Sequence, residues 1–155
     1  MPRISVIGIG SDFGDDRAGW RVAELLAGSS QSLAKIEGVT ITACRSPGSE
    51  LPGLLMAADI AIVVDAVVSG GAPGTVHRLS GRCLPSLESA GLSSHGMSLQ
   101  TLLELAKTLG NGPSDLVIYG IESESIDVDS EMSQAVFRAV SFVVDKIKQD
   151  IVHYS

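Results

Sequence analysis

The 155-residue chain lacks the features that define several large classes of protein. It has only two cysteines, Cys44 and Cys83, 4% aromatic residues, and a formal net charge of −7. Two cysteines without a CxxC pair predict neither a structural zinc site nor a disulfide scaffold, so we expect two reduced thiols. The acidic balance disfavours nucleic acid and anionic membranes as partners, because both are bound through basic surfaces.

Long apolar runs are missing as well. No run reaches the roughly 18 residues of a membrane span. Residues 3–10 enter an apolar segment directly, without the basic region and cleavage site of a signal peptide, so we expect a cytoplasmic protein. Its length and its 45% hydrophobic and 19% charged residues suit one globular domain, predicted over residues 1–155 and expected to be a monomer.

What the chain does have is an alternation of strand and helix patterns. Strands are predicted at residues 3–10, 39–44, 60–64 and 116–121, with a short edge strand at 75–79. A polar loop is predicted at 11–17, and helices at 18–27, 50–57, 98–109 and 130–151. The last helix has an apolar stripe of Val136, Val140, Val143, Val144, Ile147 and Ile151, and Asp127, Asp129 or Ser130 as a possible cap. This order predicts a three-layer α/β/α fold, with a mostly parallel twisted sheet of about five strands and helices on both faces.

Three polar residues lie at the ends of these elements, and their positions predict a functional site. Asp16 follows the first strand, Asp65 ends the third, and His95 precedes the predicted helix at Ser98. In an open parallel sheet, ligands bind outside the carboxyl ends of the strands at a topological switch point. If the strand order begins 2-1-3, Asp16 and Asp65 converge on one crevice, and His95 can reach the same rim.

Two chemistries fit these residues. Two carboxylates and an imidazole are ligands for a divalent first-row metal, which can polarise a peptide carbonyl and activate water. Alternatively, Asp16 and Asp65 form an aspartic dyad that shares one proton and does not need the histidine. We favour metal binding. Asp65 also has a structural alternative, as a cap or hydrogen-bond acceptor of the following loop.

Other polar residues have simpler interpretations. Asp15 is assigned to compensation of the helix dipole, and His77 and His153 are assigned to the solvated surface. The glycines at 8, 10 and 14 have the spacing GxGxxxG, which differs from the dinucleotide motif GxGxxG, and the neighbouring carboxylates would repel a pyrophosphate. A nucleotide site is therefore the less favoured alternative.

Four blocks of the sequence resemble the hydrogenase maturation endopeptidase family. The blocks are VIGIGS with GDDRAGW at residues 6–20, VVDA with APGT at 63–75, SHGMSL at 94–99, and YGIESE at 119–124. They occur in the family's order and span most of the chain. Ser11 stands where the family commonly has Asn, and Ser123 stands where it commonly has Pro.

The resemblance implies an endopeptidase that removes a C-terminal extension from the nickel-loaded large-subunit precursor of a nickel–iron hydrogenase. The family's metal-contacting residues match Asp16, Asp65 and His95, which makes nickel, presented by the precursor, the implied metal. Ser46, Ser49 and Glu50 are candidate substrate contacts, with a turn and helix cap as the alternative. A chaperone that binds the precursor without cutting it is the rival function.

Overall fold

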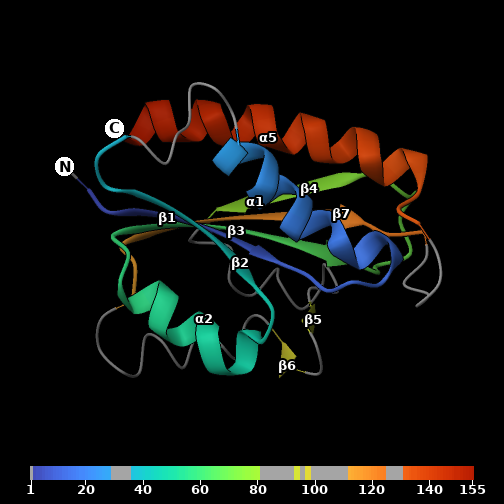
Figure 1. Ribbon diagram of the computed structural model, residues 1–155, viewed down its shortest axis with the longest axis horizontal. Coiled ribbons are helices and arrows are strands. Elements are labelled where there is room, and N and C mark those ends of the chain that lie inside the picture. Colours follow the sequence, from blue (N-terminus) through green and yellow to red (C-terminus); the bar gives the residue numbers. More distant parts are fainter. Residues whose placement is uncertain (1, 29–35, 81–92, 95–96, 99–111, 125–130) are drawn as a thin grey trace.

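The protein folds as three layers, a central sheet with helices on both faces, as the sequence predicts (Figure 1). The computed structural model describes residues 2–28, 36–80, 93–94, 97–98, 112–124 and 131–155. Within these ranges, no helix combines the length and the apolar composition that a membrane span requires.

The sheet has five strands in the order β2-β1-β3-β7-β4. The first four run parallel, and β4 is an antiparallel edge strand beside β7. The strands are β1 (Ile4–Ile9), β2 (Val39–Cys44), β3 (Ile60–Val67), β4 (Val76–Ser80) and β7 (Asp115–Glu122). The predicted edge strand is therefore confirmed, and the 2-1-3 order on which the site prediction was conditional is present. β1 and β3 are neighbours, and their carboxyl ends lie at the same edge of the sheet.

The helices divide between the two faces. α1 (Ala18–Gly28) and α5 (Gln134–Tyr154) cover one face, and α2 (Pro47–Met56) covers the other (Figure 1). All six residues of the predicted α5 stripe are buried, and they pack with α1 and one side of the strands in a single apolar cluster. A second cluster joins α2 to the opposite side of the strands. In α1 the buried residues include Val22 and Leu26, whereas Ala27 is exposed.

Several predicted boundaries are wrong. The predicted loop at 11–17 contains a 3-10 helix, η1 (Gly14–Arg17). α2 begins at Pro47 rather than at residue 50, because a proline's fixed φ and missing N–H suit the first helical position. α5 begins at Gln134, and its cap is Ser133, whose hydroxyl accepts from the Val136 amide at 3.5 Å. The cap predicted at 127, 129 or 130 is therefore wrong.

Two short strands, β5 (Ser93–Ser94) and β6 (Met97–Ser98), pair antiparallel on the side of the sheet that α2 covers (Figure 1). Ser98, predicted to start a helix, therefore belongs to a strand. The rest of that predicted helix, at residues 99–109, lies outside the described residues, as does Cys83.

Candidate functional site

Asp16 lies in η1, between β1 and α1. Only 9% of it is exposed, and η1 packs against β3, the strand that bears Asp65. The Ser11 hydroxyl donates a hydrogen bond to Asp16 Oδ2 at 2.5 Å, and the Ser11 amide donates to the backbone oxygen of Asp16 at 3.2 Å. Ser11, which differs from the common family residue, thus fixes the loop that carries this carboxylate.

Asp65 lies inside β3 rather than at its end. β3 continues to Val67 because its pairing with β7 extends as far as the pair Val67 and Glu122. Asp65 is 2% exposed and alternates in phase with Val63 and Val67, which belong to the cluster beneath α2. Its side chain therefore points to the α2 face, at the carboxyl edge of the sheet.

The third predicted ligand, His95, lies outside the described residues. In the sequence it stands between β5 and β6, which lie on the α2 side of the sheet (Figure 1). The structure thus puts Asp16 after β1 and Asp65 within the neighbouring strand β3. Among the described residues alone, no group of three His, Cys, Asp or Glu side chains could hold a metal ion.

Asp15 has a different role from the one predicted. Its carboxylate is fully buried, so it does not act as a surface charge at a helix end. It accepts hydrogen bonds from the Glu124 amide at 2.7 Å, the Ser133 amide at 2.7 Å and the Ser133 hydroxyl at 3.0 Å. Asp15 therefore ties η1 to the segment after β7 and to the start of α5, which holds the neighbouring Asp16 in place.

Glu50 organises the segment between β2 and α2. Its Oε2 accepts from the amides of Arg45 and Ser46, both at 3.0 Å, and from the Cys44 thiol at 3.2 Å. These hydrogen bonds lower the pKa of Glu50, and the one from the Ser46 amide has the largest effect. The Ser49 hydroxyl donates to the Ser46 backbone oxygen at 3.2 Å. The contacts of this segment are those of the turn and helix cap that was the alternative interpretation.

The buried thiol of Cys44 is predicted to be unreactive in the folded protein. Burial first, and then the hydrogen bond to Glu50, raise the pKa of Cys44 to about 12. Because the thiolate is the reactive form, its population at pH 8 is about a thousandfold below that of a thiol with the ordinary value of 9.0. We expect timed alkylation with iodoacetamide, followed by peptide mass spectrometry, to label Cys44 only after unfolding in guanidinium. Rapid labelling of the native protein would contradict this.

A polar cluster that the sequence analysis missed lies at the same edge of the sheet. Glu122, the last residue of β7, is 1% exposed. Its carboxylate accepts hydrogen bonds from the Ser69 amide at 3.2 Å and from the Ser69 hydroxyl, and it contacts His77 Nε2 at 2.9 Å. His77 is therefore not the solvated residue that was predicted. An antiparallel edge strand starts at the carboxyl edge of a parallel sheet, and this rule could have indicated that His77 lies there.

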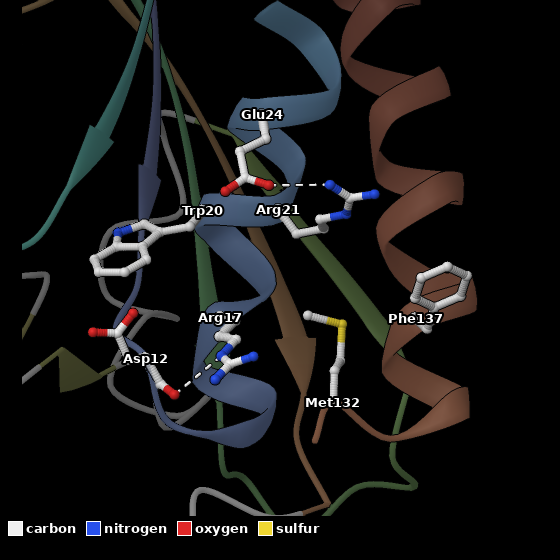
Figure 2. A pocket seen from close by; sticks show the side chains of 7 residues that line it. All are labelled: Asp12, Arg17, Trp20, Arg21, Glu24, Met132 and Phe137. Carbon is white, nitrogen blue, oxygen red and sulfur yellow. Dashed lines mark hydrogen bonds and ion pairs between the residues drawn. The ribbon is translucent and has the colours of Figure 1, made fainter. Parts of the chain in front are cut away.

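A groove of about 480 Å³ opens beside η1 (Figure 2). Its lining combines charged and apolar side chains of η1, α1, α5 and the segments that precede η1 and α5: Asp12, Arg17, Trp20, Arg21, Glu24, Met132 and Phe137. Arg17 Nε donates to the Asp12 backbone oxygen, and Arg21 pairs with Glu24, both at 3.0 Å. The groove belongs to the α1 and α5 layer, whereas Asp65 faces α2, so the two lie on opposite sides of the sheet.

Comparison with known proteins gives consistent matches. A family model described as hydrogenase maturation protease matches residues 23–150. The hydrogenase 2 maturation protease of Escherichia coli (strain K12) is 32% identical over 127 residues, 81% of this chain and 76% of that protein. The hydrogenase expression/formation protein HupD of Thiocapsa roseopersicina is 31% identical over 131 residues, 81% of this chain and 57% of that protein.

Solved structures agree with these matches. The hydrogenase maturating endopeptidase HybD from E. coli has a TM-score of 0.83 at 25% identity, covering 99% of this chain and 94% of that one. The [NiFe] hydrogenase maturation protease HycI from Thermococcus kodakarensis KOD1 has a TM-score of 0.71 at 27% identity, and the match covers 96% of this chain and 91% of that one.

The fold is of the open α/β sheet class, and two buried carboxylates lie at the carboxyl edge of the sheet, where such sheets bind their ligands. Within that class, the chain belongs to the hydrogenase maturation protease family, and it is an endopeptidase. The family resemblance of the sequence blocks is thereby confirmed.

Proposed function

We propose that this endopeptidase removes the C-terminal extension of the large-subunit precursor of a nickel–iron hydrogenase after nickel has been loaded. The observation that carries the proposal is the position of two nearly buried carboxylates at neighbouring strands of a maturation-protease fold, Asp16 after β1 and Asp65 within β3. The relatives' names, hydrogenase 2 maturation protease and [NiFe] hydrogenase maturation protease, support the substrate class.

In this proposal Asp16, Asp65 and His95 contact the nickel of the precursor, which makes the metal part of the substrate. Carboxylate oxygens and an imidazole nitrogen are donors that suit a first-row divalent ion. A positive ion also interacts favourably with two nearly buried carboxylates. Such an ion, when bound, supplies polarisation of a carbonyl and activation of water. The residues of this chain position the ion and the adjacent peptide bond.

The test uses the purified protein and a purified precursor, with and without nickel, and weighs the large subunit by mass spectrometry. We expect its mass to fall by that of one C-terminal peptide, only when nickel is present. Cleavage of the nickel-free precursor would favour the aspartic dyad over metal contact. Binding of the nickel-loaded precursor without a change of mass would reject the protease and favour the chaperone.

We also propose that the protein acts as a monomer in the cytoplasm, as one domain over residues 1–155. Light scattering after gel filtration should then give about 16.1 kDa. Ser46, Ser49 and Glu50 are exposed after the carboxyl end of β2, which supports a contact with the precursor in addition to their turn and cap contacts.

A further inference from the structure

The register of the sheet puts His77, which belongs to the cluster with Glu122 and Ser69, in the same row as Asp65. Asp65 on β3 pairs with Gly120 on β7, and Gly120 pairs with His77 on β4. Paired residues point to the same face of a sheet, so Asp65 and His77 both face the α2 side. The residue between them is a glycine, which puts no side chain in the row. Two strand spacings separate the two Cα atoms by about 10 Å.

Glu122 holds the His77 ring in a defined state. In the tautomer with the hydrogen on Nε2, His77 donates to the Glu122 carboxylate across their 2.9 Å contact. In a neutral ring Nδ1 is then a hydrogen-bond acceptor. The carboxylate is 1% exposed, whereas the His77 side chain is 33% exposed. A buried group therefore orients a ring that a large ligand can reach.

The segment before β4 is fastened to the same strand end. The Gly74 amide donates to the Glu122 backbone oxygen at 2.8 Å, and the Glu122 amide donates to the Thr75 oxygen at 2.9 Å. The Ser69 contacts hold the start of this segment to the Glu122 carboxylate. The segment that leads to His77 is therefore hydrogen-bonded to Glu122 at both of its ends. This limits the conformational entropy that the segment loses when His77 binds a ligand.

We infer that His77 is a substrate-binding residue of the cleavage site, which accepts a hydrogen bond from an N–H or O–H of the precursor polypeptide beside the group held by Asp65. Glu122 and Ser69 are positioning residues that act through the His77 ring. The inference rests on the proposed function, because the precursor is the ligand. It adds a contact on β4 to the three residues of the predicted metal site.

The test measures the KM and kcat of cleavage, and the Kd of the nickel-loaded precursor, for His77→Ala and His77→Gln. Loss of one oriented hydrogen bond should raise KM and Kd of His77→Ala about tenfold and change kcat less than about threefold. His77→Gln should recover most of the affinity, because its amide can donate to Glu122 and still offer an acceptor. The matched control is His153→Ala, since His153 is exposed in the last turn of α5 and should leave all three constants unchanged.

A second readout is the imidazole ¹⁵N signal of His77, which should shift when the precursor is added, whereas that of His153 should not. Glu122→Gln should weaken binding in the same direction as His77→Ala. Unchanged KM and Kd in His77→Ala, or a loss of stability alone, would overturn the inference while wild-type cleavage upholds the proposed function. If the wild type does not cleave, the proposed function fails, and Kd and the ¹⁵N signal still decide whether His77 contacts the precursor.

Discussion

Replacing Asp65 by asparagine is expected to abolish precursor cleavage, by about a thousandfold or more, while the protein stays folded. The two side chains have nearly the same shape, so packing beneath α2 is preserved. Asparagine, however, lacks the negative charge that a metal contact or a shared proton requires. Cleavage is followed by mass spectrometry of the large subunit, and folding by circular dichroism and Tm. Asp16→Asn and His95→Ala should give the same loss.

The control for this prediction is Asp145→Asn, the same change at an exposed position on the outer side of α5. It should retain full activity. Processing at the wild-type rate by Asp65→Asn, with nickel-loaded precursor in excess, would remove Asp65 from the site. A lost activity accompanied by a lost fold would instead assign Asp65 a structural role.

Replacing Gly8 by alanine is expected to destabilise the protein by about 3 kcal/mol or more, or to prevent folding. A Cβ at Gly8 would lie 2.1 Å from the backbone oxygen of Gly19, and a Cβ at Gly19 would lie 2.0 Å from the oxygen of Ile9. The first turn of α1 therefore packs on β1 backbone to backbone. Neither neighbour is the end of a flexible side chain, so the backbone itself must shift. Urea unfolding measures the change.

Gly53→Ala is the matched control, because a Cβ at Gly53 meets nothing within 4 Å. Gly53 lies inside α2, where alanine is favoured over glycine by about 1 kcal/mol, so this variant should be neutral or more stable. An unchanged free energy of unfolding in Gly8→Ala would contradict the prediction, because it would show that α1 can move away from β1 without cost. The expected contrast also gives a packing reason for Gly8, the first glycine of the GxGxxxG spacing, in place of phosphate binding.

Local patterns predicted most of the strands because burial on both faces leaves short, continuous apolar runs. β2 was predicted with its observed bounds, and β1 and β7 within two residues. The helix starts were less predictable. Pro47 suits both a turn and the first position of a helix, and only the packing of Leu51 and Leu55 under the sheet selects the helix.

The roles of single polar residues depend on contacts that are distant in the sequence. Asp15 bonds to residues more than 100 positions away, and Glu122 bonds to residues 45 and 53 positions away. No local pattern contains those partners. Asp15 was therefore interpreted as a charge that compensates the helix dipole, and His77 as a residue of the solvated surface. For the same reason, Glu122 was not selected at all.

The sequence by itself determined the α/β class and selected two carboxylates, one after the first strand and one at the predicted end of the third, as a candidate site. These depend on apolar periodicity and on the general rule that parallel strands bring their carboxyl ends to one edge. The tertiary structure alone decided the register that aligns Asp65, Gly120 and His77, and the burial of Glu122 behind them. Register is set by pairing between strands far apart in the chain, where a shift of one residue turns every side chain to the other face.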